Sequence, residues 1–185
     1  PAFDGRTANI YNALFYSRKA DKLHQEFIDG VFHTDPPMSA AEQREAFQEA
    51  LTQSLEEAFS VEVVRTIHES FTDRMARHKE EKDPEPLTVT VGELEGILRD
   101  CGVPQERIGA FQGECEERFG AGAVLSPANL IDPGKFELKT SQASVSISPE
   151  CTYLMETRVI DGKRYILIPA EDAVEVNGQT VRLLT

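Results

Sequence analysis

Cysteine is scarce in this sequence, and the spacing of the few cysteines excludes two kinds of site. Cys101, Cys115 and Cys151 are the three cysteines of the 185-residue chain, and no two of them form a C-x-x-C pair. Structural zinc sites and dithiol redox motifs are built on such pairs. Three widely spaced cysteines instead predict reduced thiols in a cytoplasmic protein.

Long apolar runs and clustered positive charge are also missing. No stretch reaches the roughly 18 apolar residues that a membrane span requires, and no basic-then-apolar signal sequence opens the chain. The 19 Lys and Arg residues are scattered among 32 Asp and Glu residues, for a net charge of −13. Phosphate-binding surfaces need clustered Lys and Arg, so this charge argues against nucleic-acid binding and against binding to anionic membranes.

Familiar catalytic motifs are absent as well. The sequence contains no G-x-S-x-G, no P-loop and no G-x-G-x-x-G. His68 and Glu69 begin like H-E-x-x-H, but residue 72 is Thr, so the second zinc-binding His is missing. Because His68 follows the apolar-stripe residue Ile67 by one position, we expect it to lie half-exposed on a helix surface.

The remaining candidates for catalysis lie near the N-terminus. His24 and His33 flank an apolar stretch that contains Asp29 and is followed by Asp35. Imidazole and carboxylate groups of this kind can assemble an acid–base or metal site. Their spacing matches no metal-ligand template, so they are candidates for catalysis only, and no metal or cofactor is predicted.

A ligand pocket is a second use for the N-terminal residues. Asn12 and Tyr16 lie on one short segment with further polar and aromatic side chains. They could line a pocket completed by residues upstream. Tyrosines that pack with their hydroxyl groups outward explain the same pattern.

A β-hairpin is the expected structure of this N-terminal region. Apolar and aromatic residues are frequent in 9–16 and in 27–32, which favours two paired strands over 9–33. The periodicity of the first stretch suits a short helix equally well, so both structures stay open.

Two helices are predicted between residues 39 and 81. Ser39 and Glu42 have the spacing of a capping box at the start of the first helix. Ser60 can cap the second helix, and almost no linker separates the two. Amphipathic helices joined this closely favour an antiparallel helical hairpin. Residues 1–83 would then form one segment, which we expect to continue a domain that begins upstream.

Pro84 and Pro86 interrupt a charged stretch that is the predicted linker to a second domain, residues 87–185. Two helices are expected within 91–119, and Gly102 is suited to end the first of them. Their order resembles a helix-turn-helix. However, the second helix carries four Glu against two Arg residues, and an acidic recognition helix would repel phosphates.

Strands are expected from residue 135 to residue 183. Asp161-Gly162 and Asn177-Gly178 are typical of type I′ hairpin turns. The first turn creates a largely apolar face on its hairpin, on which Val159 opposes Arg164, Thr157 opposes Ile166, and Met155 opposes Ile168. The predicted fold class is therefore α+β, in which a helical hairpin and a short helix pair pack with an antiparallel β-meander that ends in two tight hairpins.

Three segments are similar to a known bacterial family: PAFDGRTANIYNALFYSR, EFIDGVFHTDPPM with the AAEQ that follows, and ETRVIDGKRYILIPAEDAVEVNG. They resemble the C-terminal half of domain-of-unknown-function family 4317, which is found mostly in clostridial species. The similarity runs the whole length of the chain. It implies a longer intracellular protein with additional sequence upstream, in agreement with the missing initiator Met. It implies no activity and no catalytic residue.

The first hypothesis for function is therefore a non-catalytic cytoplasmic region with a regulatory or protein-interaction role. An acidic surface suits a basic or neutral protein partner. The alternative is part of an enzyme whose active site is shared between residues 1–35 and an upstream region. Nucleic-acid binding is a distant third because of the charge. A concave pocket near the N-terminal candidates would favour the enzyme, and a flat apolar patch on the meander or the helical hairpin would favour interaction.

Overall fold

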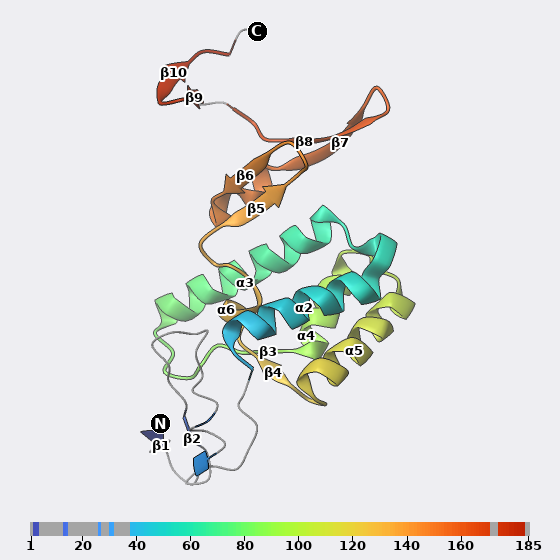
Figure 1. Cartoon of the computed structure of the whole chain (residues 1–185), viewed down its shortest axis with the longest axis vertical. Coiled ribbons are helices and arrows are strands. Elements are labelled where there is room, and N and C mark those ends of the chain that lie inside the picture. Colours follow the sequence, from blue (N-terminus) through green and yellow to red (C-terminus); the bar gives the residue numbers. More distant parts are fainter. Residues whose placement is uncertain are drawn as a thin grey trace.

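The helices of this protein gather in one part of the molecule, and β-hairpins extend from it, as Figure 1 shows. The computed structural model describes residues 2–3, 13–14, 26, 30–31, 38–170 and 174–183. The helices are α2 (Ala40–Leu55), η1 (Glu56–Ala58), α3 (Val61–Glu81), α4 (Val91–Asp100), α5 (Gln105–Phe119), α6 (Pro127–Leu130) and η2 (Pro149–Leu154), of which η1 and η2 are 3-10 helices. The strands are β1 (Ala2–Phe3), β2 (Ala13–Leu14), β3 (Val89–Thr90), β4 (Val124–Leu125), β5 (Phe136–Lys139), β6 (Ser144–Ile147), β7 (Glu156–Ile160), β8 (Lys163–Leu167), β9 (Val174–Val176) and β10 (Gln179–Val181).

In the N-terminal region the described positions differ from the expected hairpin over 9–33. Ala13–Leu14 is a strand, but it pairs with Ala2–Phe3. Gly30 and Val31 are helical, within the stretch expected to be the second strand. The rest of that predicted hairpin lies outside the described residues.

The predicted helical hairpin is confirmed, together with both of its caps. Ser39 Oγ accepts from the backbone N–H of Glu42 at 3.2 Å, and the Glu42 carboxylate accepts from the Ser39 N–H at 2.7 Å. Ser60 caps α3 through the N–H of Val63. Figure 1 shows α3 running back along α2. The helix starts could be predicted because a cap needs only residues close in the sequence.

The turn between α4 and α5 also follows from local sequence. Gly102 has a φ of 78°, a conformation that favours glycine. Its N–H donates to the carbonyl of Arg99, and the N–H of Val103 donates to that of Leu98, which is the Schellman arrangement. Val103 and Leu98 are both buried, as the hydrophobic contact of that motif requires.

One hydrophobic core joins all the helices from α2 to α6. Phe47 packs with Phe71 of α3 at a ring-centroid distance of 6.5 Å and with Phe111 of α5 at 6.2 Å. The buried members of this core are Phe47, Ala50, Leu51, Leu55, Val63, Ile67, Phe71, Val89, Leu94, Leu98, Val103, Ile108, Phe111, Cys115, Leu125, Leu130 and Ile131. The prolines at 84 and 86 therefore connect helices that share one core, although the sequence placed these helices in separate segments, 1–83 and 87–185.

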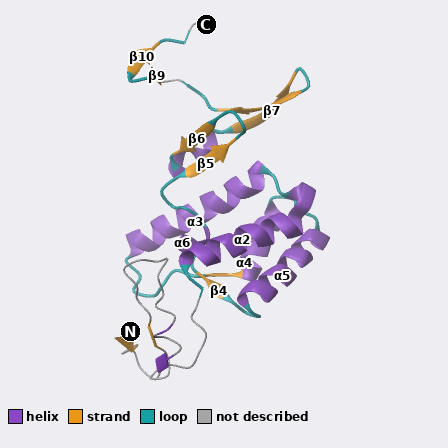
Figure 2. Ribbon diagram, in the orientation of Figure 1, coloured by secondary structure: helices purple, strands orange, loops and turns teal. Residues whose placement is uncertain are grey.

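The strands after residue 135 form separate antiparallel hairpins. β5 pairs with β6, β7 with β8, and β9 with β10. The predicted antiparallel strands are present as separate pairs rather than as one continuous meander. Between β6 and β7 the chain forms η2, which begins at Pro149. A smaller hydrophobic cluster of Phe136, Ile147 and Met155 attaches this region to α3. Figure 2 shows most of the helices (purple) gathered together, with the C-terminal hairpins (orange) beyond them. The α+β class is confirmed.

Both predicted hairpin turns are present in the expected register. Asp161 and Gly162 have φ values of 50° and 74°, and Asn177 and Gly178 have 52° and 79°, as a type I′ turn requires at both central positions. Val159 opposes Arg164 and Thr157 opposes Ile166.

Among the described residues, no helix has both the length and the apolar character of a membrane span.

Candidate functional site

The six residues proposed from the sequence as catalytic or ligand-binding candidates lie outside the described residues. These are His24, His33, Asp29, Asp35, Asn12 and Tyr16. Their role therefore stays a prediction. Within the described part of the chain, no group of three His, Cys, Asp or Glu side chains is placed to hold a metal ion.

His68 is buried, which corrects the expected half-exposed position. Its side chain lies on α3 with 5% exposure. Nε2 donates to the backbone carbonyl of Asp132 at 2.9 Å, and the ring meets that of Phe136 edge-on at 5.2 Å. The reason is that α3 buries two faces, one against the helical core and one against the segment that leads into β5. The imidazole N–H is committed to a carbonyl, so His68 holds this segment in place.

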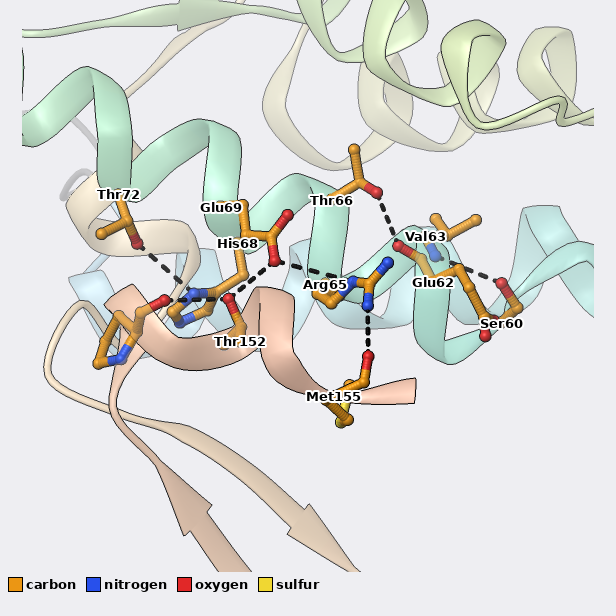
Figure 3. Close-up of polar contacts among 11 residues, drawn as sticks. Ser60, Glu62, Val63, Arg65, Thr66, His68, Glu69, Thr72, Thr152 and Met155 are labelled. Atoms are coloured by element: carbon orange, nitrogen blue, oxygen red, sulfur yellow. Dashed lines mark hydrogen bonds and ion pairs between the residues drawn. The ribbon is translucent and has the colours of Figure 1, made fainter. Parts of the chain in front are cut away.

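A polar network attaches η2 to the same helix, as Figure 3 shows. Thr152 Oγ1 lies 2.9 Å from Glu69 Oε1 and 2.9 Å from the carbonyl of Pro149, so its hydrogen is shared between two acceptors. Arg65 donates from Nη1 to the carbonyl of Met155 at 2.7 Å. Arg65 Nε lies 3.7 Å from Glu69 and is buried without a hydrogen bond. We call the contacts of Arg65 and Glu69 with Thr152 and Met155 the α3–η2 network.

The network holds η2 against α3. Glu62, in the first turn of α3, is a carboxylate whose pKa is perturbed. The hydroxyl of Thr157 on β7 donates to Glu62 and lowers the pKa of this carboxyl. Glu62 therefore stays ionised and holds β7, because hydrogen bonding to the charged form favours it.

An open groove of about 800 Å³ lies between the start of α3 and two of the hairpins. We call it the hairpin groove. It is lined by Glu57, Phe59, Ser60, Val61 and Glu62 from η1 and α3, by Leu138, Thr140, Ala143 and Val145 from β5–β6, and by Thr157, Arg158, Val159, Arg164, Tyr165, Ile166 and Ile168 from β7–β8. Its β7–β8 wall includes the apolar face that the sequence predicted, together with Arg158 and Tyr165 from the other face of the hairpin. That wall is solvent-exposed, since Val159 is 71%, Ile166 40% and Ile168 46% exposed.

A second groove, of about 700 Å³, runs between α2 and the segment 130–138. Its cations already have partners. Arg44 Nε donates to the carbonyl of Asn129 at 3.4 Å, and Lys135 lies 3.7 Å from Glu137. Its apolar lining consists mostly of side chains that already pack in the core, whereas the hairpin groove is lined by the exposed Val159, Ile166 and Ile168.

Charge is distributed unevenly between the two parts of the molecule. Residues 38–131, the helical part, contain 19 acidic and 9 basic residues, a net charge of −10. Residues 132–170, the hairpin part, contain 5 acidic and 5 basic residues and are neutral. The acidic surface therefore belongs to the helices, and the exposed apolar surface belongs to the neutral hairpins.

The arginines of the acidic helix α5 are ion-paired. Arg118 Nη1 lies 2.6 Å from Glu49, and Arg107 Nη2 lies 2.7 Å from Glu56. Both contacts tie α5 to the α2–η1 segment. These cations are occupied within the chain, which leaves the carboxylates to dominate the exposed surface of α5.

These features define a mixed α+β protein in which an acidic helical core carries a neutral array of β-hairpins. Within that class, the chain belongs to the family described as Domain of unknown function (DUF4317), which matches residues 1–179. Comparison with curated proteins and with solved structures found no match. The family membership confirms the resemblance noted in the sequence and carries no activity with it.

The sequence did not reveal the α3–η2 network. Thr152 and Met155 lie more than 80 residues from Glu69 and Arg65, and no local pattern relates them. The apolar face of β7–β8 could be predicted, because two-residue turns fix the register of a hairpin. Its exposure could not, since that depends on which distant elements cover it.

Proposed function

We propose that this chain is a non-catalytic, cytoplasmic protein-interaction region whose contact surface is the hairpin groove. The observation that carries the proposal is the exposed apolar face of β7–β8, formed by Val159, Ile166 and Ile168. Contiguous exposed apolar surface on a folded protein marks a binding site more often than a scatter of single side chains does.

The pairing of the strands supports the same proposal. Among the described residues β7–β8 has no third strand. A two-stranded hairpin is marginally stable in water unless another element covers it. A partner that packs on the exposed face, or that adds a strand to an edge, would supply the missing burial.

Charge and cysteine content fit this function. The acidic helical part suits a basic or neutral protein partner, and it disfavours the phosphates of nucleic acid, which therefore remains the third hypothesis. Cys101, Cys115 and Cys151 are all free, which favours the reducing cytoplasm.

The enzyme alternative depends on residues 1–35, most of which lie outside the described ranges.

Site-specific photo-crosslinking tests the proposal directly. A photoreactive amino acid is introduced at Val159 in the full-length protein, expressed in the cells that normally produce it. Because this side chain is mostly exposed and lies in the groove, we expect its irradiation to capture a protein. The matched control carries the same amino acid at Glu80, which is exposed near the end of α3, away from the hairpin groove.

Unfolding curves of both labelled proteins first establish that each is folded. The proposal predicts a discrete crosslinked band from position 159 that is absent from position 80. Equal, weak crosslinking from the two positions would overturn it.

A further inference from the structure

The hairpin groove contains two charged side chains of opposite sign that have no partner within the described residues. Two of its four charged residues, Glu62 and Arg158, already bond to neighbouring side chains. Glu57 and Arg164 line the same groove and make no hydrogen bond or ion pair within the described part of the chain. An occupant of the groove should therefore bring an anion for Arg164, a cation for Glu57 and an apolar surface between them.

A second copy of the same surface meets all three requirements. We infer that two copies of this chain associate through their hairpin grooves about a two-fold axis, with Arg164 of each copy paired with Glu57 of the other. In such an isologous contact, the two-fold axis makes each pair of residues occur twice in the dimer. The inference rests on the proposed function and identifies the partner of the same groove.

The distribution of charge favours this mode of self-association over others. A contact between two helical parts would bring two net charges of −10 together, and like charges facing each other disfavour an interface. The hairpin part is neutral and projects away from the helices (Figure 1). Association through the grooves instead sets the neutral hairpins of each copy against η1 and the start of α3 of the other, and it brings no two helical parts face to face.

The apolar wall adds the burial that such a contact needs. Val159, Ile166 and Ile168 are all exposed in one copy and would be covered by the equivalent residues of the other. Central apolar contacts surrounded by polar pairs are the usual anatomy of a protein interface.

Sedimentation velocity over a range of protein concentrations measures the association. The wild-type protein is expected to shift from the monomer to the dimer mass as concentration rises. Arg164→Glu and Glu57→Arg each place two like-charge pairs in the contact, so each is expected to weaken dimerisation by about tenfold or more. Both residues are exposed, and unfolding curves verify that the variants are folded.

Mixing the two variants provides the decisive measurement. The glutamate introduced at position 164 of the first variant would face the arginine introduced at position 57 of the second, and the other contact would keep its native pair of Arg164 and Glu57. Both pairs in the mixed dimer are then attractive, so the mixture should associate within about threefold of the wild-type Kd although neither variant does so alone. The double variant Glu57→Arg with Arg164→Glu should also dimerise.

Lys163→Glu is the matched control, because it makes the same charge change one residue away, at an exposed position that is not part of the groove lining. It should leave the Kd within about threefold of wild type. A wild-type protein that stays monomeric at every concentration would overturn the inference. So would a mixture of the two variants that stays monomeric.

The crosslinking at position 159 separates failure of this inference from failure of the proposed function. A product with the mass of two copies supports both. If the chain is monomeric and captures a different protein, the inference that a second copy occupies the groove is overturned, and the proposed interaction function stands. Monomeric behaviour without any crosslink overturns both.

Discussion

The hydroxyl of Thr152 lies 2.9 Å from the carboxylate of Glu69, which is 83 residues earlier in the sequence. Thr152 is fully buried on η2, whereas Glu69 lies on α3. One turn earlier on α3, Arg65 reaches the carbonyl of Met155, immediately before β7. These contacts set where β7–β8 leaves the helical part, and the shape of the hairpin groove depends on them.

Removing the Thr152 hydroxyl tests the contribution of this contact. Thr152→Val keeps the shape of the side chain and deletes the hydrogen that is shared between Glu69 and the carbonyl of Pro149. We expect the free energy of unfolding to fall by about 1–2 kcal/mol, the usual effect of losing a hydrogen bond to a partly exposed charged group. Urea denaturation measures it.

The control for this change is Thr52→Val, at an exposed position of α2 where the hydroxyl bonds only to the carbonyl of Gln48. Its effect should stay within about 0.5 kcal/mol. Equal effects of the two substitutions would mean that the buried Thr152 hydroxyl adds no more to stability than an exposed one.

His68 is expected to stabilise the segment before β5 through its N–H group. His68→Leu leaves the carbonyl of Asp132 without its partner and removes the edge-on contact with Phe136. An unsatisfied buried carbonyl costs about 1–3 kcal/mol. Urea denaturation measures the loss in the free energy of unfolding. Amide hydrogen exchange should show that the substitution accelerates exchange more in β5–β6 than in α5.

His68→Gln provides a partial rescue in the same experiments, since its amide can donate to the Asp132 carbonyl. We expect an intermediate stability for this variant. A Leu variant as stable as wild type would show that the hydrogen bond is dispensable.

Local interactions explain which features of the fold were predictable from the sequence. The Ser39 cap, the Gly102 turn and the Asp161-Gly162 turn each depend on residues within about five positions of one another. The structure has all three as expected. In each case the backbone geometry demands a particular side chain or a glycine, and that requirement is visible in the sequence itself.

Long-range packing explains what was not predictable. His68 was expected to be half-exposed because the pattern of α3 reveals one apolar face, and the second face is covered by residues more than 60 positions away. Similarly, Pro84 and Pro86 have the composition of a linker, but composition does not reveal that Phe71 and Phe111 on its two sides share a core. For the candidate site, register predicted the apolar side of β7–β8, and only the three-dimensional arrangement leaves it uncovered.

Acid should reduce the stability that Glu93 provides at the start of α4. The backbone N–H of Thr90 donates to this carboxylate and lowers its pKa below the usual 4.5, with Arg74 assisting. A carboxyl whose pKa is lower in the folded than in the unfolded state stabilises the fold fully at pH values above its unfolded pKa. This contribution is lost as the pH falls through the folded pKa. Glu93→Gln keeps an acceptor for the cap and removes only the charge.

We therefore expect the difference in urea midpoint between wild type and Glu93→Gln to be largest near pH 7 and to close as the pH falls below about 4.5. Glu95→Gln on the same helix is the control, because Glu95 has no hydrogen bond or ion pair in the described part of the chain, and its small difference should not follow this course. A difference for Glu93→Gln that widens in acid would contradict the lowered pKa.

Cysteine reactivity should report whether α5 stays in the core. Burial raises the pKa of the Cys115 thiol to about 12, and the side chain is inaccessible in the folded protein. Because the thiolate is the reactive form, iodoacetamide near pH 8 should modify the partly exposed Cys101 and Cys151 and spare Cys115. Peptide mapping by mass spectrometry identifies the modified sites, and the same reaction in concentrated urea should label all three. Rapid labelling of Cys115 in buffer would mean that α5 leaves the core, and the packing of Phe111 against Phe47 would then have to be transient.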